Sequence, residues 1–308
     1  MEQATTAPLS DKDLLSCALG CFDGVHLGHR ALLEAAVRNF QGYTPAVWTF
    51  SGPTAYPYIE NVPSRLALCR SAGIEKTICE DFETVRNMQP AEFIAHLRQT
   101  YKIGHIVCGE DFRFGRDRVG DTEMLKAICL KNGISVTVVS PVMADTVLPG
   151  LAEEKISSSL IRRLIAGGEV DKAGALLGRR FSIQGEVIGG RRLGRTMNLP
   201  TVNQRLENGR ILPAAGVYDT VCRVNGKRYV SVTNIGSRPT VNNDEHDVTC
   251  ETHIIDAPDT ELDLYGLSVT VEFCRYGRPE KRFSSLDELK TAIEGDIKRA
   301  REYFKNFS

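Results

Sequence analysis

The sequence predicts an α/β protein with two domains, a Rossmann-like parallel sheet followed by an antiparallel β-barrel that ends in a helix. Two observations lead to this fold class. In residues 1–178, short apolar runs alternate with helical patterns, which is typical of a parallel sheet covered on both faces. In residues 179–308, runs rich in Val, Ile, Thr and aromatic residues follow one another without helices between them. The pattern changes near Gly178, and we place the domain boundary there.

The first domain is predicted to contain buried strands separated by helices. In sheets of this kind ligands bind at the carboxyl ends of the strands, so the loops that follow the strands are candidate sites. Two further helices follow the sheet, and Ser157 is a candidate cap for the first of them. The predicted strands are residues 14–19, 46–50, 76–79, 103–108 and 134–139, and the predicted helices are residues 28–40, 64–71, 90–101, 121–131, 157–165 and 169–177.

The second domain is predicted to be a barrel or sandwich closed by a helix. Asn225-Gly226 separates two of its apolar runs and is a strong hairpin signal. Ser285-Leu-Asp-Glu288 has the pattern of a capping box at the start of the last helix. The predicted strands are residues 181–188, 217–224, 228–235, 248–255 and 267–273, and the apolar stripe of the helix is Leu286, Leu289, Ile293, Ile297, Ala300 and Phe304.

The composition gives no indication of a nucleic-acid or membrane partner. The formal net charge is -1, so an anionic substrate has to be held by local groups. We expect no signal peptide, and no apolar run approaches the roughly 18 residues that a membrane span needs. Nine cysteines are scattered without a Cys-x-x-Cys pair, which favours reduced thiols in the cytoplasm. Cys17 and Cys21 could be a metal pair, but without a second pair nearby we prefer buried or spectator thiols.

The segment from Gly20 to His29 follows the first predicted strand and opens the first predicted helix. Glycines allow the backbone to approach a ligand, and a helix N-terminus offers free N–H groups to phosphate. His26 and His29 are three residues apart, so both can face a ligand at the helix start. A metal pair and histidines packed in a surface turn are the alternatives, but the strand-loop-helix context favours nucleotide binding.

A second glycine-rich segment, Gly189 to Thr196, almost fits the phosphate-binding pattern G-x-x-x-x-G-K-[ST]. Arg195 replaces the lysine, and Met197-Asn-Leu-Pro200 follows where that pattern requires a helix. Proline disfavours helical geometry in the residue before it. We therefore reject a Walker A site here.

The segment from Gly20 to His29 resembles the first motif of the FAD synthetase domain in bifunctional riboflavin kinase/FAD synthetases. Gly109-Glu-Asp-Phe-Arg-Phe-Gly-Arg-Asp-Arg-Val-Gly120 and Ile156-Ser-Ser-Ser-Leu-Ile-Arg162 resemble later motifs of that domain, with Ser159 where the family has Thr. The resemblance implies catalytic roles for His29 and Arg162. It also implies ATP binding by Gly20, Phe22, Asp23, His26, Gly28, His29, Ser157, Ser158 and Arg162, and FMN binding by Asp111, Phe112 and Arg118.

In the second half, Gly194-Arg-Thr-Met-Asn-Leu-Pro-Thr-Val-Asn203 resembles the riboflavin kinase motif, and residues 216–218, 234–240, 251–253, 263–266 and 278–283 match later elements in family order. The resemblance implies that Glu251 is the general base for the ribityl hydroxyl. It implies Mg²⁺ at Thr201 and Asn203, whose hard oxygens suit that ion. The implied ATP-binding residues of this domain are Gly189, Gly194, Arg195, Thr201 and Asn203, and the implied flavin-binding residues are Arg278, Glu280 and Phe283.

Three segments depart from the family pattern. Phe50-Ser-Gly-Pro-Thr-Ala-Tyr-Pro57 stands where the family has Pro-His-Pro, Met197-Asn198 replaces Leu-Gly, and Cys21 replaces a small or amide residue. We expect phosphorylation of riboflavin to FMN and adenylylation of FMN to FAD, with ATP and Mg²⁺. The open alternatives are a riboflavin kinase that has lost adenylyl transfer, a transferase with another phosphorylated acceptor, and a non-enzymatic flavin carrier. We expect small-molecule partners only, and a weak or transient homo-oligomer is left open.

Overall fold

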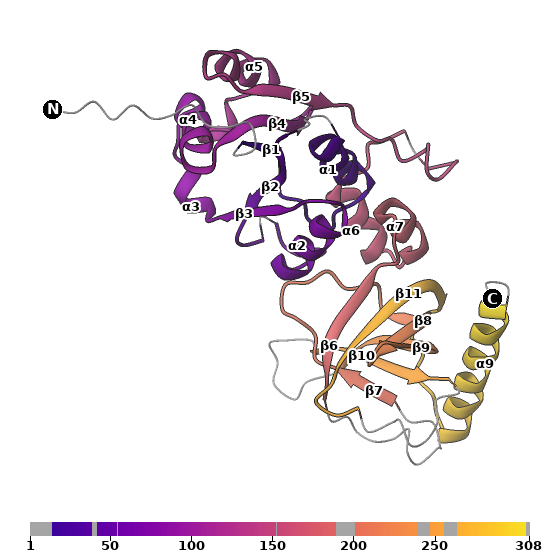
Figure 1. Cartoon of the computed structure of the whole chain (residues 1–308). Coiled ribbons are helices and arrows are strands. Elements are labelled where there is room, and N and C mark those ends of the chain that lie inside the picture. The colour runs from indigo at the N-terminus through magenta and orange to yellow at the C-terminus, as the bar shows by residue number, and fades with distance from the viewer. Residues whose placement is uncertain are drawn as a thin grey trace. The chain divides into compact units, whose positions relative to one another are not determined.

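The computed structural model describes residues 14–38, 42–53, 55–151, 153–188, 201–238, 247–255 and 264–305. The chain divides into two compact units, residues 1–158 and 159–308 (Figure 1). The second unit begins within the first turn of helix α6 (Ser158–Ala166) and includes α7 (Val170–Leu177). Gly178 ends α7 in the left-handed conformation, as a glycine after a helix commonly does.

The first unit contains a five-stranded parallel sheet in the order β3-β2-β1-β4-β5. This arrangement confirms the predicted Rossmann-like sheet. All five strands were predicted, with bounds that differ by at most two residues. The strands are β1 (Leu15–Leu19), β2 (Thr44–Phe50), β3 (Lys76–Glu80), β4 (Ile103–Gly109) and β5 (Ser135–Val139).

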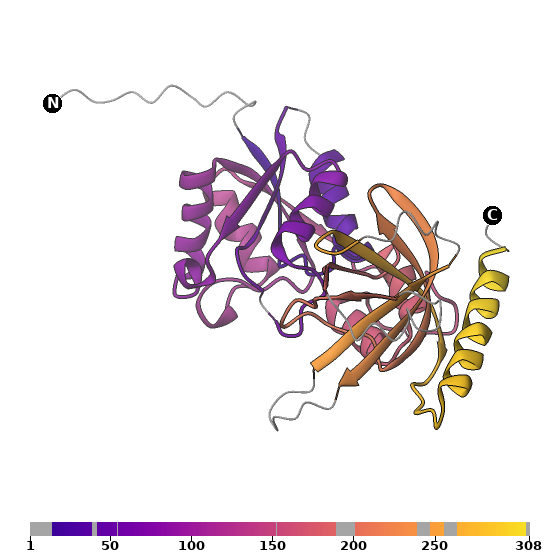
Figure 2. The same cartoon turned by 90° about the horizontal axis from the view of Figure 1, so that it is seen from below.

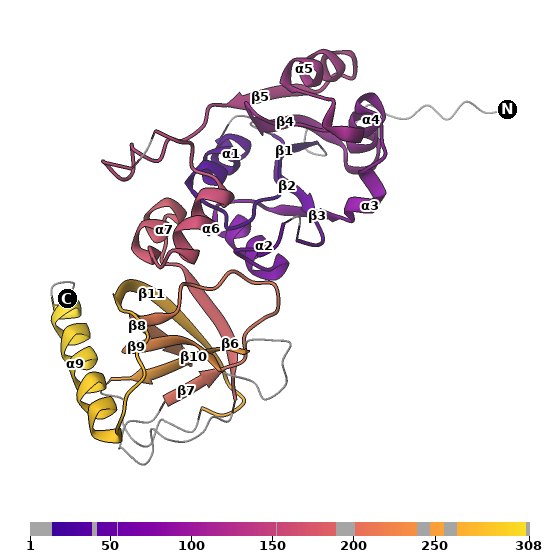
Figure 3. The ribbon, with the colours of Figure 1, turned by 180° about the vertical axis from the view of Figure 1, so that it is seen from behind.

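Helices cover both faces of this sheet (Figures 1 and 3). Because strand residues alternate between faces, Leu15, Cys17 and Leu19 of β1 pack with α4 and α5. Ala18 faces the other way and packs with α1 and α2. The helices are α1 (Leu27–Arg38), α2 (Val62–Ser71), α3 (Phe82–Val85), α4 (Pro90–Tyr101) and α5 (Thr122–Lys131). The short α3 was not predicted.

The second unit contains a closed barrel with the strand order β10-β7-β6-β11-β8-β9, in which all neighbours are antiparallel. The predicted barrel is confirmed, and Asn225-Gly226 forms the β8–β9 turn. The sequence did not predict β7 and gave β9 and β11 too short. The strands are β6 (Ser182–Ile188), β7 (Thr201–Gln204), β8 (Gly216–Val224), β9 (Lys227–Arg238), β10 (Asp247–Ile254) and β11 (Ser268–Arg278).

Strand alternation divides the barrel residues between an inner and an outer face. Hydroxyl groups of Thr220, Ser231, Thr233 and Thr252 hydrogen-bond to one another across β8, β9 and β10 at 2.8–2.9 Å, and all four are fully buried. Their neighbours Val217 and Val232 point outward instead and pack against Ala300 and Ile297 of the last helix. The hydroxyl cluster therefore lies inside the barrel, and the valines mark its outer face.

The last helix, α9 (Leu286–Lys305), lies along the outside of the barrel in all three views (Figures 1–3). Ser285 Oγ accepts a hydrogen bond from Glu288 N, as predicted for a capping box. The Glu288 carboxylate accepts from Ser284 N, one residue earlier than the pattern predicts. Leu286, the first residue of the predicted apolar stripe, is exposed.

Candidate active sites

The loop between β1 and α1 is tightly folded at the carboxyl end of β1. Gly20 N donates to Trp48 O at 3.2 Å, which continues the pairing of β1 with β2. Phe22, Gly24 and Val25 all have positive φ angles, of 52°, 84° and 41°. Such angles are unfavourable for residues other than glycine, and they persist where the surroundings impose them. Phe22 and Val25 are almost fully buried, so packing of their side chains holds this conformation.

The two predicted histidines lie face to face at the start of α1. The ring centroids of His26 and His29 are 3.6 Å apart, with an interplanar angle of 17°. His29 N donates to His26 Nδ1 at 3.2 Å, so neutral His26 carries its proton on Nε2. A Cβ atom on Gly28 would lie 3.2 Å from the His26 ring and 3.3 Å from Ile156 O, so any larger residue there would press on the histidine stack.

His29 is held in its neutral form. Burial, followed by the positive charges of His26 and Arg65, keeps the pKa of His29 well below its usual range. His29 Nδ1 is a buried nitrogen without a hydrogen-bond partner among the described residues. The Arg65 side chain is buried as well, and its Nη2 donates to Phe50 O at 2.6 Å. The sequence did not point to Arg65, because no motif contains it.

The carboxylate of Asp23 accepts hydrogen bonds from backbone N–H groups of the protein itself. Asp23 Oδ1 accepts hydrogen bonds from Ile59 N at 2.9 Å and Glu60 N at 3.0 Å. Its backbone oxygen accepts from Ser158 Oγ at 2.8 Å. Of the predicted ATP-binding residues, Asp23 and Ser158 are therefore brought into contact, and Asp23 ties the loop to residues 59–60. This arrangement assigns Asp23 a positioning role in the loop.

The remaining residues predicted for this domain lie on other segments. Asp111 pairs with Lys155, and the hydrogen bond from Lys155 lowers the pKa of Asp111. Phe112 stacks on Phe114, with ring centroids 5.7 Å apart, and Arg118 is exposed on a 3-10 turn. Ser157 precedes α6, and Arg162 lies on that helix in the second unit.

In the barrel, strand register brings three polar residues into one row on the outer face. Glu251 of β10 lies opposite Asn203 of β7 and Asn234 of β9. In the adjacent row, Thr201 lies opposite His253. Paired residues of neighbouring antiparallel strands have Cβ atoms about 5 Å apart, so their side chains share one surface. Asn234 had no predicted role, although it lies in a matched motif, because its position depends on the pairing of β9 with β10.

The predicted flavin-binding residues begin with Arg278, the last residue of β11, and continue in the segment after it. Glu280 lies beside this row, because a Cβ atom on Gly236 would come within 3.2 Å of the Glu280 carboxyl carbon and 3.0 Å of Asn234 Nδ2. Arg278 and Lys281 lie over the Phe283 ring, at 5.7 and 5.8 Å from its centroid. The predicted ATP-binding residues Gly189, Gly194 and Arg195 lie outside the described residues, as do Met197-Asn198 and residues 263 and 239–240 of the matched motifs.

Over the described ranges of the chain, no three His, Cys, Asp or Glu side chains gather in a way that could hold a metal ion. An ion at the barrel site would therefore need the mixed oxygen donors of Thr201, Asn203 and the substrates. No helix in the same ranges is long and apolar enough to cross a membrane.

Fold and sites together define a two-domain protein in which a nucleotide-binding parallel sheet precedes a flavokinase-like barrel. A family model described as FAD synthetase matches residues 10–159, and one described as riboflavin kinase matches residues 177–304. The bifunctional riboflavin kinase/FMN adenylyltransferase of Pseudomonas fluorescens is 37% identical, covering 92% of this chain and 91% of its own. The protein of the same description from Haemophilus influenzae is 34% identical, covering 96% and 97%. The chain belongs to the bifunctional riboflavin kinase/FMN adenylyltransferase family.

A solved structure has the same two-unit fold. It is described as a macrolide-efflux protein from Streptococcus pneumoniae, is 28% identical in sequence and has a TM-score of 0.81. The similarity covers 95% of this chain and 97% of that chain. The similarity in fold thus extends over both units.

Proposed function

We propose that this chain phosphorylates riboflavin to FMN in its barrel domain and adenylylates FMN to FAD in its sheet domain. The observation that carries the proposal is the row formed by Asn203, Glu251 and Asn234, which brings a candidate base next to two amide groups. The family models that match both halves of the chain support the same two activities. The functional boundary is proposed near Gly178, with residues 1–178 adenylylating and residues 179–308 phosphorylating.

In the kinase reaction, Glu251 accepts the proton of the ribityl 5′-hydroxyl while that oxygen attacks the γ-phosphorus of ATP. The bond from the γ-phosphorus to the bridging oxygen breaks, and ADP leaves. Asn203 and Asn234 lie opposite Glu251 on the two neighbouring strands, which supports a proposed role for their amides in hydrogen-bonding the reacting oxygens. Most of the rate enhancement in phosphoryl transfer comes from such positioning and from charge stabilisation.

The residues at the barrel site fit Mg²⁺. Thr201 and Asn203 supply neutral oxygen donors, and Mg²⁺ usually combines few protein ligands with substrate phosphates and water. When bound, the ion would neutralise charge that develops on the transferred phosphoryl group. On the protein side, Thr201 and Asn203 orient the phosphates. Glu251 keeps the task of accepting the proton.

In the adenylyl transfer, a phosphate oxygen of FMN attacks the α-phosphorus of ATP, and pyrophosphate leaves. His26 and the neutral His29 offer ring N–H groups at the N-terminus of α1, where the helix dipole also favours phosphate. Arg162 and Ser157 are proposed to hold the leaving phosphates, and Asp111, Phe112 and Arg118 to contact FMN. Gly20, Phe22 and Gly28 let the loop approach the nucleotide.

We propose the cytoplasm as the compartment, with small-molecule substrates as the partners. All nine cysteines are free thiols, and seven of them are buried. Burial raises the pKa of Cys250 to about 12, which keeps that thiol protonated and unreactive. A weak or transient homo-oligomer stays a prediction, and the concentration dependence of sedimentation would test it.

The proposal is tested by incubating the full chain with riboflavin, ATP and Mg²⁺ and separating the flavins by chromatography. We expect FMN first and then FAD, with one pyrophosphate released for each FAD. Formation of FMN without FAD, also when FMN is supplied, would show the kinase-only alternative. Formation of neither flavin would refute the proposal.

A further inference from the structure

Two bulges in β11 turn its arginines toward the outer face of the barrel. Phe273 lies opposite Thr220 and faces inward, so period-two alternation would also turn Arg275 inward. The register shifts between Phe273 and Arg275, and again between Tyr276 and Arg278. As a result Arg275 lies opposite the outward-facing Asp219, and Arg278 lies opposite the outward-facing Val217. Bulges commonly re-aim side chains next to active sites.

The second shift places Arg278 in the same row as the proposed catalytic base. Arg278 lies opposite Val217, Val217 opposite Asn234, Asn234 opposite Glu251, and Glu251 opposite Asn203. The row crosses the five strands β11, β8, β9, β10 and β7. Arg278 and Asn234 lie two strands apart in this row, which is about 10 Å along the barrel surface at the usual strand spacing of about 4.8 Å.

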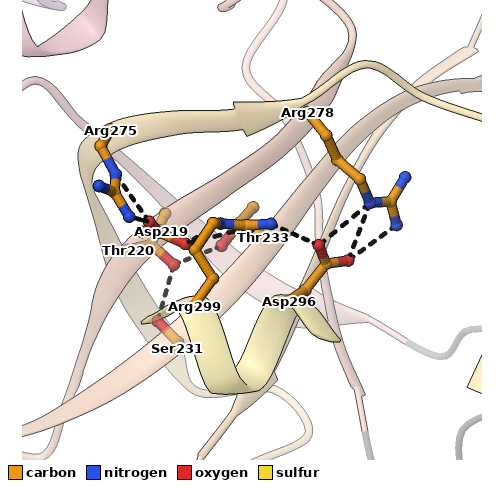
Figure 4. Close-up of polar contacts among 8 residues, drawn as sticks. All are labelled: Asp219, Thr220, Ser231, Thr233, Arg275, Arg278, Asp296 and Arg299. Atoms are coloured by element: carbon orange, nitrogen blue, oxygen red, sulfur yellow. Dashed lines mark hydrogen bonds and ion pairs between the residues drawn. The ribbon is translucent and has the colours of Figure 1, made fainter. Parts of the chain in front are cut away.

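Arg278 is held by a buried carboxylate of α9 (Figure 4). Its Nε donates to Asp296 Oδ1 at 3.0 Å and its Nη2 to Asp296 Oδ2 at 2.7 Å. The side chain of Asp296 is only 4% exposed, so this bidentate pair is shielded from water. Arg278 Nη1 also donates to Pro279 O at 3.1 Å, which fixes the start of the segment that leads to Glu280.

The same carboxylate is tied to the barrel wall. Arg299 Nη1 donates to Asp296 Oδ1 at 2.6 Å, and Arg299 Nη2 donates to Asp219 Oδ1 at 3.1 Å (Figure 4). Asp219 is fully buried and also accepts from Arg275 Nη2 at 2.7 Å. A Cβ atom on Gly277 would lie 2.3 Å from Arg299 Nη2, so β11 passes directly against this network. Asp296 therefore has a fixed position relative to β8 and β11.

We propose that Asp296 is a positioning residue for riboflavin phosphorylation, which acts by holding Arg278 and the segment Arg278–Glu280 beside Asn234 and Glu251. The inference rests on the kinase function proposed above. Glu280 lies over Gly236, next to the Asn234 amide. A shift of the segment Arg278–Glu280 would therefore move Glu280 relative to Asn234 at the proposed site.

The test measures KM for riboflavin and kcat for phosphorylation in the full chain, with adenylyl transfer to supplied FMN as an internal control. In Asp296→Asn we expect KM for riboflavin to rise about tenfold, because displacement of the segment Arg278–Glu280 weakens riboflavin binding. We expect kcat to fall by a smaller factor. Adenylyl transfer stays unchanged. Glu294→Gln, an exposed carboxylate on the same helix, is the matched control and should leave both activities unchanged.

A double-mutant cycle separates positioning from a merely structural role. If Asp296 acts through Arg278, then Arg278→Gln alone raises KM similarly, and adding Asp296→Asn raises it no further. Additive effects on KM would overturn the proposal, as would an unchanged KM in Asp296→Asn. If the barrel of Asp296→Asn does not fold, which circular dichroism would show, Asp296→Glu and Arg278→Gln provide the test. Asp296→Glu should then give an intermediate KM, and a KM equal to that of wild type in both variants would refute the role.

The outcome distinguishes this inference from the function on which it rests. A wild-type chain that phosphorylates riboflavin while Asp296→Asn behaves like Glu294→Gln overturns only the role of Asp296. A wild-type chain without kinase activity overturns the proposed function and this role together.

Discussion

The loop between β1 and α1 and the outer row of the barrel are assembled in different ways. The loop is one contiguous segment, and its histidines are placed by backbone angles, a glycine and a buried aspartate. The row is drawn from five strands, and its members are placed by strand register, with Arg278 held in addition by the Asp296 carboxylate. Activity at the loop should therefore be sensitive to changes in backbone conformation. Activity at the row should instead be sensitive to loss of a functional group or to displacement of the residues next to the row.

The largest effect is expected at the row, where the side chain of Glu251 is the proposed proton acceptor. Glu251→Gln removes the proton acceptor but keeps the shape of the side chain. We expect kcat for riboflavin phosphorylation to fall about 10²- to 10⁴-fold, as measured by FMN formation. Glu186→Gln, a change in a partly exposed carboxylate of β6, is the control. Unchanged turnover in Glu251→Gln would remove the catalytic role of Glu251.

The next largest effect concerns the stability of the parallel sheet and its dependence on pH. His105 is fully buried between Ser16 Oγ at 2.9 Å and Thr137 Oγ1 at 2.9 Å, and burial lowers its pKa to about 4. The unfolded chain therefore binds a proton below pH 6.5 that the folded chain does not bind until about pH 4. Stability of the first unit should fall by about 3 kcal/mol as pH drops through this window and then level off.

Trp48, the single tryptophan, lies in the first unit and can report its unfolding in urea. In His105→Gln the urea midpoint should depend less on pH between 6.5 and 4 than in wild type. An equal slope in the two proteins would show that His105 is not the group responsible.

Asp23→Asn tests whether the loop depends on its buried anchor. The change weakens two hydrogen bonds from backbone N–H groups to a carboxylate, each worth about 1.5–3 kcal/mol at most when charge-assisted. We expect the first unit to lose about 2 kcal/mol in urea unfolding followed by Trp48 fluorescence. Asp81→Asn, which changes an exposed helix cap in the same unit, should cost less. The opposite order would mean that Asp23 contributes mainly to ligand binding.

The smallest effect is expected for Gly28→Ala, which tests whether the loop tolerates a side chain at this position. The new methyl group would press on the His26 ring and on Ile156 O, at 3.2 and 3.3 Å. Adenylyl transfer should fall about tenfold while phosphorylation of riboflavin is unaffected. Gly52→Ala, where nothing lies within 4 Å, should change neither activity. Equal adenylyl transfer in the two variants would contradict the need for a glycine at position 28.

The difference between the sites also explains what the sequence could predict. The loop was predicted because Gly20, His26, Gly28 and His29 are neighbours in the chain. The sheet and barrel followed from the periodicity of apolar residues. The row was not predicted, because β7 is short and the facing of Arg278 depends on two bulges that leave no local signal. Arg65 was missed for a related reason, since its burial and its hydrogen bond to Phe50 O are tertiary effects.

The central claim is that the two sites act separately within one chain. It is tested most directly by giving riboflavin or FMN to the full-length variants Glu251→Gln and His29→Asn and measuring FMN and FAD. We predict that Glu251→Gln makes FAD from FMN at the wild-type rate but makes little FMN from riboflavin. We predict that His29→Asn makes FMN at the wild-type rate but little FAD. Loss of both activities in either variant, or of neither, would contradict the claim.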